Sequence, residues 1–368
     1  MSKKDKTRKY SLKRKILFSF VTFVISAILV FFILEIIMEI FSPKGYLYPR
    51  YKFSKEYGHV LYENQIIEHY NPPYKKIYTT NKYGLRGKIV PVSNSYNKLN
   101  IILLGDSFTF GIGVNDGNEF ASIMSEKLKN DYNIINTAVG GWGLTQQVRK
   151  YYEFGQLYNP EIVILVFCGN DPEDNFNNKV TIIEDGRFKF QDSNNSINWI
   201  KKYLSKSVIQ KSNVYNMLRN SIYLLFRKKI TGEAIDEHIF EASTLKNKKE
   251  INPMEQFYNE ILELFAKDLY NRSIKLIMFS INELKNNGEI FCQLENYQLI
   301  ENKVTELDSL GYLDYININE CFNDPVDFKI SPVGHYDKRW NILIGNYLSE
   351  IIMKQDTCIK DTIKSTIY

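Results

Sequence analysis

The sequence predicts an α/β protein: a three-layer α/β/α sandwich around a five-stranded parallel sheet, preceded by one N-terminal transmembrane helix. Apolar segments of strand length alternate with segments whose apolar residues recur at helical spacing, which is typical of a parallel sheet covered by helices. A long uncharged run near the N-terminus precedes all of them. The predicted strands are residues 101–104, 132–136, 162–167, 275–280 and 315–318, and the predicted helices are residues 119–128, 255–270 and 295–310.

The uncharged run covers residues 16–34, which as a helix would span about 28 Å, close to the hydrocarbon thickness of a bilayer. A buried core helix would not be apolar on every face. A secretory signal is usually shorter and is followed by small residues at a cleavage site, whereas Glu35 and Glu39 follow here. We therefore predict an uncleaved single-pass anchor over residues 16–38. The basic arm, residues 1–15, would be cytoplasmic and the body of the chain would lie outside the cytoplasm.

Charge and cysteine content exclude other classes of function. Residues 1–15 carry eight lysines and arginines and one aspartate, whereas the rest of the chain has 39 basic and 41 acidic residues. The body of the protein therefore has no electrostatic basis for binding nucleic acid. The four cysteines are scattered without a Cys-x-x-Cys spacing, so we expect no metal site, redox motif or cofactor. Cys168, beside a predicted strand, is interpreted as a packing residue.

A serine follows the first predicted core strand. Residues 101–104 form a continuous apolar run that ends in Gly105-Asp106-Ser107. In open α/β sheets the carboxyl ends of the strands are where ligands bind, so Ser107 is a candidate nucleophile. The Gly-x-Ser-x-Gly elbow is excluded because Thr109 stands where its second glycine would be. No Gly-Lys-Ser/Thr follows, which excludes a phosphate-binding loop.

Three further groups of polar residues follow later predicted strands. The strand at 132–136 leads into a turn containing Gly140-Gly141, whose backbone N–H groups no side chain would shield. The strand at 162–167 leads to Gly169-Asn170-Asp171, where the Asn170 amide would be a neutral hydrogen-bond donor. His335 follows the last strand. Each group alone is also compatible with an ordinary turn or a structural histidine.

Together these blocks resemble the GDSL/SGNH hydrolase family. Gly105-Asp106-Ser107-Phe108 resembles its first block, and the glycine-rich turn, Gly169-Asn170-Asp171 and His335 resemble the next three in the same order. The resemblance implies a flavodoxin-like SGNH fold in a catalytic domain at residues 96–355. It also implies catalysis by Ser107 and His335, with an oxyanion hole formed by the N–H groups of Ser107 and Gly141 and by Asn170.

The sequence departs from the family pattern at the catalytic acid. The family places an acid two or three residues before the histidine, and here those positions hold Val333 and Pro332. The displaced candidates are Asp324, Asp327 and Asp337, of which Asp337 is better placed to cap a helix. We therefore predict a Ser107–His335 dyad.

Two regions lie outside the resemblance. Residues 42–95 are rich in tyrosine and proline and predict a semi-extended juxtamembrane stalk packed on the catalytic body. Within it, Arg86 would either clamp an acidic group or, as we favour, hold a loop. Residues 176–250 form an insertion with a hairpin at Asp185-Gly186 and an amphipathic helix with apolar residues at Val214, Met217, Leu218, Ile222 and Leu225. It would be a lid, or would rest on the membrane or on a partner chain.

We expect an SGNH-type serine esterase acting outside the cytoplasm on an acylated cell-surface glycan or lipid. One alternative is an O-acyltransferase that modifies an exported polysaccharide. The other is a non-catalytic binding protein on the same scaffold, which the absent acid favours. The expected partners are the acylated carbohydrate or lipid ester and, through the N-terminal helix, the membrane.

Overall fold

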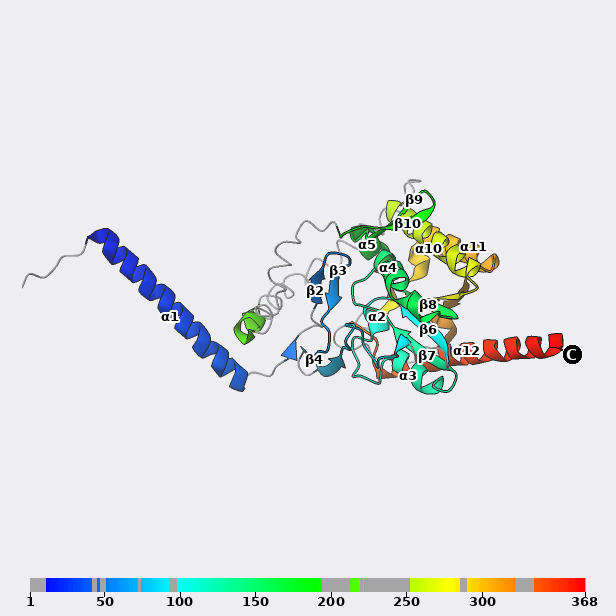
Figure 1. The fold of residues 1–368 in the computed structure, drawn as a ribbon, viewed down its shortest axis with the longest axis horizontal. Coiled ribbons are helices and arrows are strands. Elements are labelled where there is room, and N and C mark those ends of the chain that lie inside the picture. The colour runs from blue at the N-terminus through cyan, green and yellow to red at the C-terminus, as the bar shows by residue number, and fades with distance from the viewer. Residues whose placement is uncertain are drawn as a thin grey trace, which may run out of the picture. The chain divides into compact units, whose positions relative to one another are not determined.

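The computed structural model describes residues 11–41, 45–46, 51–71, 74–92, 98–193, 212–218, 221, 252–284, 290–321 and 334–367. The chain divides into two compact units, of which one combines Met1–Lys44 with Lys206–Thr244 and the other combines Gly45–Ser205 with Leu245–Tyr368. The second unit contains the sheet and all of the predicted site residues (Figure 1).

The second unit is organised around a five-stranded, fully parallel sheet in the order β14-β11-β8-β6-β7. Because β6 is the first core strand and its neighbours β7 and β8 are the second and third, this is the flavodoxin-like order. The predicted fold class is confirmed. The strands are β6 (Leu99–Leu104), β7 (Tyr132–Asn136), β8 (Ile162–Phe167), β11 (Lys275–Ser280) and β14 (Asp314–Asn317).

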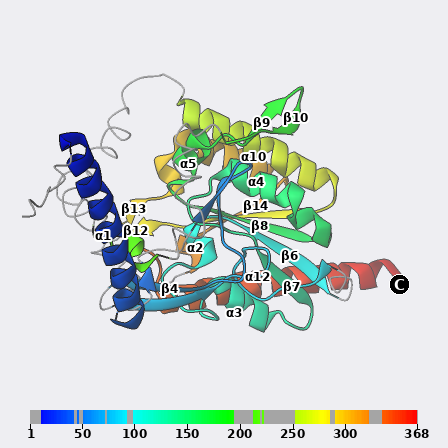
Figure 2. The same ribbon diagram turned by 60° about the vertical axis from the view of Figure 1, so that its left-hand side comes forward.

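Helices cover both faces of the sheet, on opposite sides of the strands in Figure 2. Side chains alternate between faces along each strand, so Ile102 and Leu104 pack with α4, α10 and α11, whereas Ile101 and Leu103 pack with α3 and α12. The helices are α2 (Ser107–Phe110), α3 (Phe120–Lys127), α4 (Leu144–Glu153), α5 (Asp171–Asn177), α10 (Pro253–Asn271), α11 (Gln298–Ser309) and α12 (Lys338–Ile367). Short 3₁₀ turns are Gly155–Tyr158, Leu294–Asn296 and Ile318–Cys321.

The three predicted core helices are confirmed as α3, α10 and α11, with small shifts at their ends. The Asn252 side chain caps α10 by accepting from the Met254 N–H, and Pro253 occupies its first turn. The helix predicted at 295–310 begins instead as the Leu294–Asn296 turn and continues as α11. The Asn296 side chain accepts from the backbone N–H of Gln293, which stabilises this separate turn.

The segment between the apolar helix and the sheet contains strands that the sequence analysis did not anticipate. Strand β2 (Tyr51–Ser54) pairs with β3 (Gly58–Leu61) in an antiparallel hairpin. Strands β1 (Gly45–Tyr46), β4 (Ile66–Asn71) and β5 (Tyr74–Thr79) form a separate small sheet. Tyr57, Leu61 and Trp142 belong to one buried cluster, so this segment packs on the catalytic fold.

Arg86 holds a loop, as predicted. Its guanidinium is almost fully buried and donates to the carbonyl oxygens of Phe110, Gly111 and Val114. It also pairs with Asp116 at 2.9 Å and Glu119 at 3.5 Å. These contacts fix the chain that follows Ser107. Arg86 therefore has a structural role in holding this loop.

The hairpin predicted at Asp185-Gly186 is confirmed as β9 (Thr181–Glu184) and β10 (Arg187–Phe190). A second short hairpin is formed by β12 (Glu283–Leu284) and β13 (Ile290–Cys292). Of the predicted insertion helix, residues 213–218 are helical, whereas Ile222 and Leu225 lie outside the described residues.

Helix α1 (Leu12–Phe41) is long and apolar enough to cross a membrane, and none of its residues is buried in the structure. It contains the span predicted at 16–38. In the same unit, the carboxylate of Glu35 accepts hydrogen bonds from the backbone N–H groups of Asn213 and Val214 at 2.8 and 3.1 Å. Ten residues of the basic arm lie outside the described residues.

Candidate active site

Ser107 lies where the topology of the sheet favours a site. The chain leaves β6 for β7 on one side and later returns to β8 on the other, so the carboxyl ends of β6 and β8 flank the switch point of the sheet. Ligands of open α/β sheets bind in the crevice at such a point. Ser107 is the first residue of α2, directly after β6. A Cβ on Gly105 would overlap the Thr109 side chain, which explains the glycine before Asp106.

The structure brings Ser107 and His335 into contact. Nε2 of His335 lies 2.8 Å from Oγ of Ser107, although 228 positions separate the two residues in the chain. The imidazole ring packs 4.7 Å from the ring of Phe108. Both Ser107 and His335 are half-buried, so the pair is reachable from solvent.

The loop that carries His335 is anchored by its neighbours. The Tyr336 hydroxyl donates to the Asn282 carbonyl at 2.6 Å and accepts from the Asn282 N–H at 3.1 Å. Asp337 caps α12 through the N–H groups of Arg339 and Trp340, as predicted. These contacts fix the chain directly after His335.

Asp106 places a carboxylate beside the pair. Its Oδ1 accepts from the Phe108 N–H at 2.9 Å, which caps α2, and its Oδ2 lies 3.2 Å from Oγ of Ser107. Burial raises the pKa of Asp106, against the effects of the Phe108 N–H and of the His335 charge. The Ser107 hydroxyl has one proton, which it can donate either to Asp106 or to His335. Only the hydrogen bond to His335 activates the serine as a nucleophile.

Of the other acids considered in the sequence, only Asp337 lies among the described residues. Asp337 serves as a helix cap. Asp324, Asp327, Pro332 and Val333 lie outside the described residues. The dyad therefore stays a prediction.

The glycine-rich turn lies against Ser107. A Cβ on Gly140 would come within 3.3 Å of the Ser107 Cβ and 2.5 Å of the Tyr51 hydroxyl oxygen, so only glycine fits there. Gly141 has a φ of +74°, a conformation that favours glycine. The Gly140–Gly141 peptide is thus beside the nucleophile, and the role of the Gly141 N–H in an oxyanion hole stays a prediction.

Asn170 is at the end of β8, immediately before α5. Its Nδ2 donates to Oδ2 of Asp174 at 2.7 Å, which fixes the orientation of the amide. Oδ2 of the buried Asp171 accepts from the Cys168 N–H at 3.0 Å and closes the turn. The amide is half-buried, next to the strand that precedes Ser107, and its role in the oxyanion hole stays a prediction. Cys168 is fully buried in the core, as expected for packing.

Two site residues come from the β2–β3 hairpin and were missed in the sequence. Nε2 of His59 lies 2.9 Å from the carbonyl oxygen of Gly140. The Tyr51 ring packs on His59, and burial together with the nearby charge of Asp106 raises the pKa of its hydroxyl. The only sequence signal was a histidine and tyrosines between prolines, and their contact with the turn depends on how the hairpin docks. His69 instead bonds to the Tyr78 hydroxyl at 2.8 Å in the interior.

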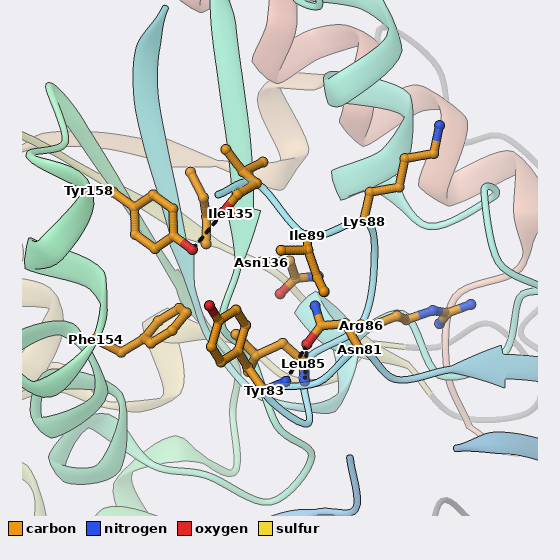
Figure 3. Close-up of a pocket in the computed structure, with 11 residues that line it drawn as sticks. Asn81, Tyr83, Leu85, Arg86, Lys88, Ile89, Ile135, Asn136, Phe154 and Tyr158 are labelled. Carbon is orange, nitrogen blue, oxygen red and sulfur yellow. Dashed lines mark hydrogen bonds between the residues drawn. The ribbon is translucent and has the colours of Figure 1, made fainter. Parts of the chain in front are cut away.

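A small pocket, separate from this site, is lined in part by residues between 81 and 90 (Figure 3). The rings of Tyr83, Phe154 and Tyr158 surround it, and the Tyr158 hydroxyl donates to the Val90 carbonyl at 2.9 Å. Its volume of about 10 Å³ has room for about one water molecule. It is therefore part of the packing of this segment and not a substrate site.

No model of a protein family matches the sequence, and no curated protein matches it. The chain is similar in structure to the psychrotrophic esterase EstA from Pseudoalteromonas sp., with 11% identity over 70% of this chain and 98% of that one and a TM-score of 0.40.

Two further similar structures are a protein assigned to the G-D-S-L lipolytic family from Desulfitobacterium hafniense DCB-2 and Est24, a carbohydrate acetylesterase from Sinorhizobium meliloti. The first has 10% identity over 69% of this chain and 99% of that one, with a TM-score of 0.39. The second has 10% identity over 70% and 100%, with a TM-score of 0.38. The flavodoxin-like strand order and the Ser107–His335 contact of the chain itself accord with the resemblance to the GDSL/SGNH hydrolases.

Proposed function

We propose that the protein is a serine-dependent ester hydrolase that works through an acyl-enzyme. One observation carries the proposal: Nε2 of His335 lies 2.8 Å from Oγ of Ser107 at the switch point of the sheet. A nucleophile and a base in hydrogen-bond contact are the minimum that acyl transfer needs.

In the first half of the reaction, Nε2 of His335 accepts the Ser107 proton as Oγ forms a bond to the ester carbonyl carbon. The electron pair of the carbonyl moves onto its oxygen. The N–H groups of Ser107 and Gly141 and the Asn170 amide stabilise that oxyanion. Collapse breaks the bond to the alkoxide, which leaves as an alcohol with the proton from His335. In the second half, His335 accepts a proton from water as the water oxygen forms a bond to the acyl carbon. Collapse of this second tetrahedral intermediate breaks the bond to Oγ of Ser107, which takes the proton back from His335, and the acid is released.

Asp106 contributes a negative charge beside His335. Its buried carboxylate interacts favourably with the positive charge on His335. The imidazolium formed on proton transfer is therefore stabilised from the serine side of the pair.

The proposed substrate is an acylated glycan or lipid at the outer face of the membrane to which α1 anchors the enzyme. The apolar surface of α1 and the eight basic residues among positions 1–15 support this placement. A reporter enzyme fused after Tyr368 should be active only in an exported compartment, on a chain of uncut length. Cytoplasmic activity, or the loss of about 40 residues, would refute the proposed topology.

The activity is tested with the full chain in detergent and a short-chain aryl ester such as p-nitrophenyl acetate. Ser107→Ala is the matched control because it removes only the hydroxyl. The proposal expects turnover by the parent and none above background by the variant. Equal rates would point to the non-catalytic binding protein, and a large excess of acyl transfer to an added sugar over hydrolysis would point to the O-acyltransferase.

A further inference from the structure

The peptide between Gly140 and Gly141 is the centre of a tight turn. The Trp142 N–H donates to the Val139 carbonyl at 3.2 Å, and Gly141 has a φ of +74° whereas Gly140 has no positive φ. This combination defines a type II turn, in which the second central residue is left-handed. The N–H that the proposed mechanism uses is therefore the N–H of the central peptide of this turn.

The turn alone does not fix the orientation of its central peptide. Type I and type II turns differ by rotation of that peptide, which reverses the directions of its C=O and N–H. A side chain at either central position would favour one form, but both positions here are glycine. The close approach of Ser107 and Tyr51 to Gly140 prevents a side chain there. A contact from outside the turn must then select the orientation.

His59 makes that contact. Its Nε2 lies 2.9 Å from the Gly140 carbonyl oxygen, and because a carbonyl only accepts, Nε2 carries the hydrogen. The C=O and N–H of a trans peptide point in opposite directions. A hydrogen bond that holds the Gly140 carbonyl toward His59 therefore holds the Gly141 N–H on the other side of the peptide.

The imidazole of His59 is itself fixed. The Tyr51 ring packs edge-on against it, with centroids 5.0 Å apart. The Trp142 indole N–H donates to the His59 carbonyl at 2.9 Å, whereas the His59 side chain donates to the Gly140 carbonyl. The turn and strand β3 therefore each donate one hydrogen bond to the other. The Tyr57 ring stacks on the Trp142 indole, with centroids 4.9 Å apart, and helps to hold the indole in place.

We infer that His59 is a positioning residue that locks the Gly140–Gly141 peptide with its N–H aimed at the oxyanion. The inference rests on the proposed function and extends it to the juxtamembrane hairpin, which would then complete the catalytic site. The hydrogen bond to the carbonyl also polarises the peptide and strengthens its N–H as a donor. Because His59 acts through the turn, its loss should lower kcat and leave substrate binding nearly unchanged.

The test uses three variants of the full chain. His59→Phe keeps a ring against Tyr51 but removes the donor. His59→Gln places an amide N–H about where Nε2 stands, and His59→Asn is one methylene shorter and cannot reach. Removing an oxyanion donor outright costs roughly 10²–10³ in kcat, so a misoriented one should cost about 10- to 100-fold. We expect this loss in the Phe and Asn variants, with KM within about threefold, and recovery of most of the rate in Gln.

The rate at which a phosphonate ester modifies Ser107 should follow the same order, since its addition also develops an oxyanion. Parent-like kcat in the Phe variant, equal losses in Gln and Asn, or a loss confined to KM would overturn the inference. If the Phe variant does not fold, the comparison of Gln with Asn decides. A parent no faster than Ser107→Ala would instead mean that the proposed function has failed, and the role of His59 with it.

Discussion

Nε2 of His335 and Oγ of Ser107 lie 2.8 Å apart although 228 positions separate the two residues in the chain. Ser107 begins α2, and His335 lies just before α12. Asn341 of α12 holds this geometry by accepting from the Phe120 N–H of α3 at 3.0 Å. Gly345 allows the two helices to approach, because a Cβ there would come within 2.6 Å of Ile123. The distance between base and nucleophile is therefore set by the packing of α12 on α3.

Asp106→Asn should make the protein more stable and the enzyme slower. The amide keeps an oxygen for the Phe108 N–H but removes the charge that stabilises protonated His335. The pKa of Asp106 is raised in the fold, so this carboxyl favours folding below its unfolded pKa of about 3.9 and disfavours it as the pH rises through the folded pKa. The advantage of Asn over Asp in unfolding temperature should therefore grow with pH above about 4.

The matched control is Asp337→Asn, which exchanges one good helix cap for another and should change kcat by less than about tenfold. Thermal unfolding of the parent and both variants between about pH 4 and pH 8 measures the effect. If the difference in unfolding temperature between Asp106→Asn and the parent were constant across this range, burial would not raise the pKa of Asp106 in the folded protein.

Asn170→Ala should lower kcat by roughly 10²–10³ with little change in KM, the usual loss for one oxyanion donor. The amide is half-buried and already oriented by Asp174, so its removal should not disturb the fold. The control is Asn133→Ala, which removes an amide near the amino end of β7, whereas the site lies at the carboxyl ends of the strands. This variant should leave kcat unchanged. Parent-like turnover by the Asn170 variant would remove this residue from the oxyanion hole.

Arg86→Met should lower the free energy of unfolding by about 3–5 kcal/mol, because it leaves the buried Glu119 carboxylate and three carbonyl oxygens without their partner. Lys129→Met breaks an exposed pair with Glu126 and should leave the free energy of unfolding nearly unchanged. Urea unfolding of the full chain measures both. A cost below about 1 kcal/mol for Arg86→Met would show that the loop after Ser107 does not depend on Arg86.

Much of the fold could be predicted because its determinants are local. The apolar runs of β6 and β8 and the helical spacing in α10 identify these elements without knowledge of the tertiary structure. The polar residues after each strand could be assigned to one edge, since the carboxyl ends of parallel strands meet there. The pairing of Ser107 with His335 came from the resemblance of these blocks, in order, to the GDSL/SGNH hydrolases.

The residues that were missed act through contacts that no local pattern encodes. His59 was assigned to a stalk because its hydrogen bond to Gly140 spans 81 residues and requires the docking of the β2–β3 hairpin. Asp106 belongs to the first sequence block, but its closeness to His335 depends on where α12 places the imidazole. Such residues can be recognised only once the tertiary structure is known.

The central claim is that Ser107 is a nucleophile activated by His335. Intact-mass and peptide mass spectrometry of the full chain after incubation with a serine-reactive phosphonate test it most directly. The account predicts one covalent adduct on Ser107, none in Ser107→Ala, and formation slower by several orders of magnitude in His335→Ala, by analogy with a triad histidine. An unlabelled parent, or one labelled equally fast without His335, would contradict it.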